Sequence, residues 1–290
     1  MRRTRCAACS TRRSGRSRTW PHRTRSPTAR RSNSSRPWGS TPHGCTRRSR
    51  TRGSCTGRTA SASWCGARHR PRTSSPPTAV RRLTAEWTAA VERDASHPSI
   101  VTWVPFNESW GIQHVVSDPA QQAYSRALVD LTRALDPSRP VIGNDGWEQQ
   151  DTDIVTIHDY EGDGAVLART YADDAARTRA LEGLAPSGHP QFVGGAVDQG
   201  QPVMLTEFGG VRHQSGGRRE EGWGYTTATD GDDWVERITA LHDAVRASTF
   251  LAGSCWTQLT DTMQEANGLL NADRSPKVPV EQIRRAVTGQ

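Results

Sequence analysis

Apolar positions recur at helical spacing in three stretches of the chain. The first extends from about residue 76 to Asp94, and its apolar face carries Leu83, Trp87 and Val91. The second face consists of Ala123, Tyr124, Ala127, Leu128, Leu131 and Leu135, and the third of Trp234, Val235, Ile238, Leu241 and Val245. Apolar residues every three to four positions line one side of a helix, so each stretch predicts an amphipathic helix.

Short apolar runs rich in β-branched residues separate these helices. They cover residues 100–106, 140–144, 153–160, 202–210 and 251–257. Runs of this kind are typical of buried parallel strands, and their alternation with helices indicates βαβ units. Residues between 160 and 202 are rich in Gly, Ala and Asp, and we expect a long irregular region there. The pattern favours an α/β fold.

The charge is divided unevenly along the 290 residues. The net charge is +8, but residues 1–75 hold 20 of the 38 basic residues and the first acidic residue is Glu86. From residue 76 onward, 18 basic residues face 30 acidic ones. The chain is therefore predicted to consist of an acidic folded part, 76–290, behind an Arg-rich segment, 1–75.

Three hypotheses account for residues 1–75. An Arg-rich arm would bind nucleic acid, and Cys6 with Cys9 would supply half of a zinc site, although no second ligand pair follows at finger spacing. The third and favoured hypothesis is translation in the wrong frame. If the last base of each codon for residues 32–68 is joined to the first two bases of the next codon, one permitted translation has apolar residues at helical spacing. That translation ends in the strand-like run GLVVWGE. As written, the segment has too few apolar groups to fold, and we expect disorder.

No run of about 18 apolar residues occurs, and the N-terminus has no continuous apolar core of the kind an export signal needs. These observations predict a cytoplasmic protein without a membrane partner. Five of the six cysteines lie before residue 76, and only Cys255 lies beyond it, which indicates no disulfide framework in the folded part.

Candidate functional residues lie at or near the ends of the predicted strands. They include Asn107-Glu108, His158, Glu207 and Trp256. In a parallel α/β barrel the carboxyl ends of the strands meet on one face, and catalytic groups lie there. Two carboxyl groups on that face supply the acid and the nucleophile with which a retaining glycosidase cleaves a glycosidic bond.

The segments around these residues resemble glycoside hydrolase family 2, which holds β-galactosidases, β-glucuronidases and β-mannosidases. His97-Pro98-Ser99-Ile100, Trp103 and Asn107-Glu108-Ser109 are similar to its acid/base segment, and Thr206-Glu207-Phe208-Gly209 to its nucleophile segment. The resemblance covers roughly residues 80–280. It implies the C-terminal part, strands 4 to 8, of a (β/α)8 TIM barrel whose N-terminal strands are missing or scrambled.

The resemblance also implies roles for individual residues. Glu108 would be the acid/base and Glu207 the nucleophile, with Asn107 bonding the sugar's 2-hydroxyl and Trp256 forming an aromatic floor. We expect His158, Tyr160 and Trp110 to contact the sugar as well. The implied activity is hydrolysis of terminal β-glycosidic bonds by double displacement, with a carbohydrate substrate, no nucleic-acid partner, no cofactor and no metal.

Other interpretations of the same residues remain open. Asn107-Glu108 would cap a helix, Glu207 would form a structural ion pair, and His158 and Trp256 would be core residues. Trp147, Trp223 and Tyr225 fall in expected loops, whereas Asp145 and Glu148 are loop carboxylates without a clear role. At the level of the whole chain, the alternatives are an inactive barrel remnant that at most binds carbohydrate, and an Arg-rich nucleic-acid binder.

Overall fold

The computed structural model describes residues 58–61, 77–213 and 222–290. Apart from β1 (Arg58–Ser61), residues 1–76 therefore lie outside the described residues, and the expectations for them stay predictions. β1 falls within the segment for which we expected no packed structure. It pairs in parallel with β2 (Ile100–Val104), where Arg58 faces Ile100.

The predicted alternation of strands and helices is confirmed over the described residues. α1 (Pro77–Asp94) precedes β2 and β3 (Phe106–Asn107), and α2 (Pro119–Leu135) follows. β5 (Val155–Asp159), β6 (Val203–Gly209), α5 (Gly231–Ala247) and β9 (Leu251–Thr257) occupy the other predicted positions. Every named strand pair is parallel, as the apolar runs predicted.

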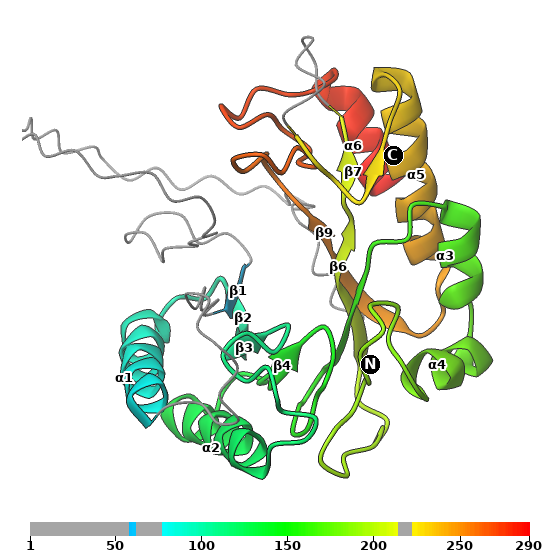
Figure 1. The fold of residues 1–290 in the computed structure, drawn as a ribbon. Coiled ribbons are helices and arrows are strands. Elements are labelled where there is room, and N and C mark those ends of the chain that lie inside the picture. Colours follow the sequence, from blue (N-terminus) through cyan, green and yellow to red (C-terminus); the bar gives the residue numbers. More distant parts are fainter. Residues whose placement is uncertain (1–57, 62–76, 214–221) are drawn as a thin grey trace, which may run out of the picture.

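The strands form an open arrangement (Figure 1). β5, β6 and β9 make a three-stranded sheet, whereas β1 pairs with β2 and β3 with β4 (Asn144–Asp145). The described residues form no closed barrel, and the assignment of these strands to barrel positions 4 to 8 stays a prediction. In Figure 1, α1 and α2 lie beside the β1–β4 group. The helices α3 (Gly164–Thr170), α5 and α6 (Val280–Thr288) lie along the three-stranded sheet.

Each group of strands has its own apolar core. Trp87 of α1 and Trp103 of β2 pack edge to face, with ring centroids 5.9 Å apart, and both are fully buried. Their indole nitrogens donate to Thr132 at 2.7 Å and to Asp136 at 2.8 Å, so neither buried polar atom lacks a partner. The second core lies between the β5–β6–β9 sheet and α5, around Trp234, Ile238 and Leu241.

The strand expected at 140–144 is shorter than predicted. It shrinks to an isolated bridge between Trp103 and Val141 and to the two residues of β4. One cause is that Val141 donates its backbone N–H to the Asp153 carboxylate at 2.7 Å, so this donor is not available to a ladder.

The region predicted to be irregular contains α3 (Gly164–Thr170) and α4 (Asp174–Leu181). The carboxylates of Asp163 and Asp173 accept hydrogen bonds from backbone N–H groups in the first turns of these helices. Both helices are too short for an apolar period to reveal them. Three elements that we did not predict are β7 (Val211–Arg212), β8 (Thr226–Thr227) and α6 (Val280–Thr288).

Candidate active site

The two predicted carboxylates meet around a buried histidine. Glu108 follows β3, His158 lies on β5 and Glu207 on β6, where His158 and Glu207 face each other in the parallel ladder. Nδ1 of His158 is 2.8 Å from Oε1 of Glu108 and 3.6 Å from Oε2 of Glu207. One atom from each of the three side chains lies within 4.8 Å of the other two. The structure therefore brings the predicted pair together.

Asp145 lies next to the other ring nitrogen of the same imidazole. Its Oδ1 lies 3.4 Å from Nε2 of His158 and accepts a hydrogen bond from Thr206 at 2.6 Å. The close approach of the β4 loop to the ring depends on Gly146, where a Cβ atom would lie 2.7 Å from the imidazole. Asp145 was a loop carboxylate without a clear role in the sequence, and only the folded chain shows that it faces His158.

The electrostatics of the site depend on this histidine. Burial alone would lower the pKa of His158, but the charges of Glu207 and Asp145 and the hydrogen bond with Glu108 raise it well above its usual value. Burial raises the pKa of Glu207, whereas His158 and Tyr160 act in the opposite direction. A cationic His158 surrounded by carboxylates is the state that these contacts favour.

Glu108, His158 and Glu207 form a group that could hold a metal ion. The sequence predicted no metal site because the three residues come from three separate strand ends. A raised pKa keeps a proton on the imidazole, and a metal would have to displace that proton before the ring could bind it. The expected absence of a metal at this group stays a prediction.

Tyr160 contacts Glu207 directly. Its hydroxyl donates to Oε2 of Glu207, and its ring stacks on Tyr225 with centroids 3.6 Å apart and an angle of 5°. Gly210 permits this stack, because a Cβ there would lie 2.5 Å from Tyr225 and 2.9 Å from Tyr160. Burial raises the pKa of Tyr225 to about 12, with the charge of Glu108 as the next cause. Tyr225 is thus a site residue that the sequence indicated only as a loop aromatic.

Asn107, Trp110 and Trp256 were also predicted to contact the sugar. Asn107 ends β3 beside Glu108 and is partly buried, whereas Trp110 is 50% exposed on the turn that follows. Glu108 begins this turn and not a helix, so the helix-cap alternative for Asn107-Glu108 is wrong. Trp256 is 5% exposed and packs edge to face on Phe208 and parallel to His242. Its position matches the core alternative that the sequence left open.

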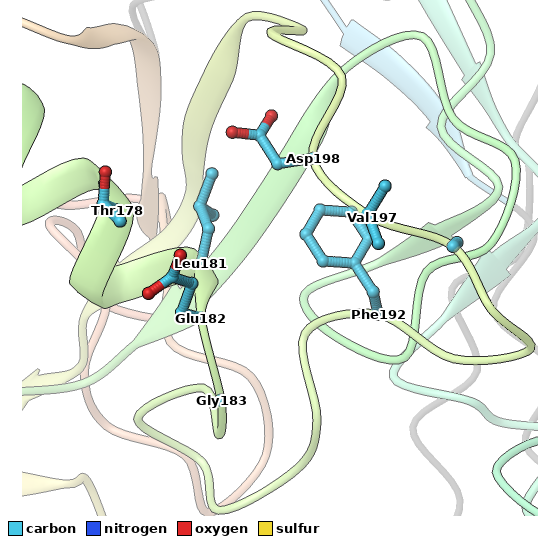
Figure 2. Close-up of a pocket in the computed structure, with 8 residues that line it drawn as sticks. Thr178, Leu181, Glu182, Gly183, Phe192, Val197 and Asp198 are labelled. Carbon is cyan, nitrogen blue, oxygen red and sulfur yellow. The ribbon is translucent and has the colours of Figure 1, made fainter.

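A separate pocket of about 470 Å³ lies between α4 and residues 192–198 (Figure 2). Leu181, Phe192 and Val197 supply apolar lining, and Asp198 is bound to Arg177 by an ion pair. The lining contains neither candidate carboxylate. The pocket is therefore distinct from the site around His158.

Residues 58–289 match the family described as glycosyl hydrolases family 2, TIM barrel domain. The chain belongs to this family. The match confirms the resemblance that the Asn107-Glu108 and Thr206-Glu207 segments carried. In the described residues, no helix is both long and apolar enough to cross a membrane.

Several known proteins are similar to part of this family 2 chain. A β-galactosidase of Psychromonas ingrahamii is 26% identical over 222 residues, which cover 71% of this chain and 18% of that protein. A family 2 β-galacturonidase from Eisenbergiella tayi, bound to galacturonate, matches with a TM-score of 0.50 and 15% identity over 74% of this chain and 38% of that one. A β-glucuronidase of an uncultured Clostridium sp. matches with a TM-score of 0.49 and 18% identity, over 73% of this chain and 36% of that one. The chain thus spans well under half of each of these three relatives.

Proposed function

We propose that this chain carries the catalytic carboxylates of a retaining β-glycosidase that cleaves terminal β-glycosidic bonds. Glu207 attacks the anomeric carbon while Glu108 protonates the leaving oxygen, which forms a glycosyl-enzyme and releases the first product. Glu108 then takes a proton from water, and the water's oxygen displaces Glu207. The reaction class follows from family membership, whereas the residue roles and the double displacement are proposals.

The observation that carries the proposal is the separation of the two carboxylates. Retaining enzymes hold their carboxyl groups about 5–5.5 Å apart, and inverting enzymes about 6.5–9.5 Å apart to admit a water. An oxygen of Glu108 lies within 4.8 Å of an oxygen of Glu207. This short approach supports a retaining pair, in which one carboxylate attacks the anomeric carbon directly.

Two contacts of Glu207 stabilise the ionised form that a nucleophile needs, whereas burial, the largest influence, leaves the pKa of Glu207 raised overall. A nucleophile must be ionised, and burial alone disfavours the charged form. The Tyr160 hydroxyl donates to Glu207, and the His158 cation lies 3.6 Å away; both stabilise the negative charge. Nδ1 of His158 also lies 2.8 Å from Oε1 of Glu108, so a single imidazole nitrogen lies next to both carboxylates.

The substrate class is proposed from the relatives. One is named a β-galactosidase, one a β-glucuronidase and one a β-galacturonidase bound to galacturonate. We therefore propose a β-linked hexose or hexuronic acid at the non-reducing end of the substrate, and no nucleic-acid partner.

Activity tests separate this proposal from the inactive-remnant alternative. The chain is assayed with nitrophenyl β-galactoside, β-glucuronide and β-galacturonide, and we expect turnover of at least one substrate. Glu207→Gln should abolish turnover, and a 2-fluoro glycoside should label Glu207 covalently. Absence of turnover and of labelling in a folded chain would support the remnant. Glu182→Gln, an exchange on the rim of the separate pocket, is the matched control and should retain activity.

We also propose that residues 1–75 arise from translation in the wrong frame. The acidic composition that begins after residue 76 supports this proposal. The family match begins at residue 58, inside the segment, so the gene itself has to be sequenced across codons 1–76. Third bases that exclude the regrouped reading would overturn the proposal.

A further inference from the structure

The backbone at Glu108 and Ser109 is left-handed. Their φ angles are 53° and 56°, a conformation that residues with a Cβ atom rarely adopt, and here two such residues are consecutive. Backbone of this kind persists only when the surrounding structure holds it, and it concentrates at functional sites. Contacts that hold these two residues therefore also determine where the Glu108 carboxyl points.

Three hydrogen bonds from the segment after β3 to β4 hold this backbone. The N–H of Glu108 donates to the Asp145 carbonyl at 3.0 Å. The N–H of Ser109 donates to Oδ1 of Asn144 at 2.9 Å, and Nδ2 of Asn144 donates back to Oγ of Ser109 at 2.9 Å. Asn144 is 1% exposed and Ser109 is 4% exposed, so water does not compete for these bonds.

Glu148 completes the arrangement. The Ser109 hydroxyl donates to Oε2 of Glu148, and His189 lies 2.8 Å from Oε1 of the same carboxylate. Glu148 is 5% exposed, although a carboxylate is seldom buried unless it is paired. The proposed reaction does not use this carboxylate, whose partners are Ser109 of the acid/base segment and His189 of the loop after α4.

We infer that Ser109, Asn144 and Glu148 form a clamp that positions the acid/base carboxylate Glu108. These three are positioning residues and do not themselves touch the reacting atoms. The inference rests on the proposed role of Glu108. It assigns a role to Glu148, a residue whose function the sequence left open.

The clamp has a consequence that depends on the leaving group. A poor leaving group, such as an alkoxide, needs its oxygen protonated by Glu108, whereas dinitrophenolate departs without protonation. A displaced Glu108 should therefore slow the first step, which kcat/KM reports, for alkyl glycosides and leave it nearly unchanged for dinitrophenyl glycosides. The second step, in which Glu108 acts as the base, should slow for both. Loss of folded protein would reduce kcat/KM for both substrates by the same factor.

The test uses the full chain with Ser109→Ala and Glu148→Gln, which retains the shape of the side chain. Ser117→Ala is the matched control, because Ser117 is exposed and lies beyond the same turn. We expect kcat/KM for a methyl β-glycoside to fall about 10-fold or more, and that for the dinitrophenyl glycoside to fall by less than about 3-fold. Azide should restore turnover of the dinitrophenyl substrate where deglycosylation has become slow.

A crystal structure of each variant provides a measurement that does not depend on activity. We expect Glu108 to leave the left-handed region and its contact with His158 to lengthen beyond 2.8 Å. Equal losses for both leaving groups, or an unmoved Glu108 in both variants, would overturn the clamp. If the unmodified chain cleaves none of the glycosides, the proposed function fails, and the crystal structures alone decide whether the clamp exists.

Discussion

His158 donates to Glu108 across 2.8 Å although 50 residues separate them in the chain. The contact joins the end of β3 to β5, and the parallel register of β5 with β6 brings Glu207 to the same imidazole. One buried cation therefore lies against both candidate catalytic carboxylates. The protonation of the site has to be considered for the three residues together.

Replacing His158 with Gln should shift the acidic limb of the pH profile. His158 lowers the pKa of Glu207, so its removal raises that pKa, and Glu207 stays protonated up to a higher pH. We expect the acidic limb of kcat/KM to move to higher pH and its maximum to fall about 100-fold. His114→Gln, at an exposed histidine, is the control. An unchanged acidic limb would contradict the role given to His158.

Tyr160→Phe tests the second group that stabilises the Glu207 carboxylate. The change removes the hydroxyl that donates to Oε2 and leaves the ring stacked on Tyr225. We expect kcat to fall about 10-fold or more and the acidic limb to move to higher pH, because hydrogen bonding from Tyr160 lowers the pKa of Glu207. Tyr124→Phe removes a hydroxyl bonded to Thr84 and should leave the pH profile unchanged.

The sequence predicted the carboxylate pair because each residue follows a strongly apolar strand. Strand ends can be read locally, and parallel strands bring their ends to one face. The partners of the pair could not be predicted in this way. Asp145 lies on the two-residue β4, Ser109 in a turn and Glu148 in the loop after β4, and their roles depend on which of these segments face each other in the folded chain.

The misplaced elements have physical causes of the same kind. α3 and α4 are short helices that begin at capping aspartates, and an apolar period needs more turns than they have. Trp256 lies near the end of β9 and packs against Phe208 and His242, which matches the core alternative, and its contact with a sugar stays a prediction. Sequence alone places a residue at a strand end without showing which way its side chain points.

His242 should make the protein less stable in mild acid. Burial lowers its pKa to about 4 from the usual 6.5, and its Nδ1 bonds the Ile238 carbonyl at 2.7 Å. Between these two values the unfolded chain binds a proton that the folded chain does not, so the free energy of unfolding falls as the pH decreases from 6.5 to 4. A shift of this size corresponds to about 3 kcal/mol.

The measurement compares urea unfolding of His242→Phe and the unmodified chain across this range. As the pH falls, we expect the unfolding free energy of the unmodified chain to decrease relative to that of His242→Phe, because the variant has no histidine to protonate at this position. His158 adds no slope in this range, because its raised pKa gives stability that is fully present below pH 6.5 and is lost only at higher pH. A difference that stays constant from pH 6.5 to 4 would contradict the prediction.

Lys277 and Asp261 form an ion pair in which loss of one partner should be costly. Nζ lies 2.8 Å from Oδ1 of Asp261 and 2.8 Å from the Ala266 carbonyl, and the lysine side chain is 0% exposed. Lys277→Met leaves the Asp261 carboxylate, itself 11% exposed, without its cation, and we expect a loss of about 3–5 kcal/mol in the free energy of unfolding.

The matched control for this pair is Arg284→Met. Its partner Glu281 is 67% exposed, and breaking such a surface pair should cost under about 1 kcal/mol. The double variant Lys277→Met, Asp261→Leu should recover part of the loss, because no charge is then left buried alone. Equal effects of Lys277→Met and Arg284→Met in urea unfolding would mean that water reaches Asp261 and that burial does not set the strength of this contact.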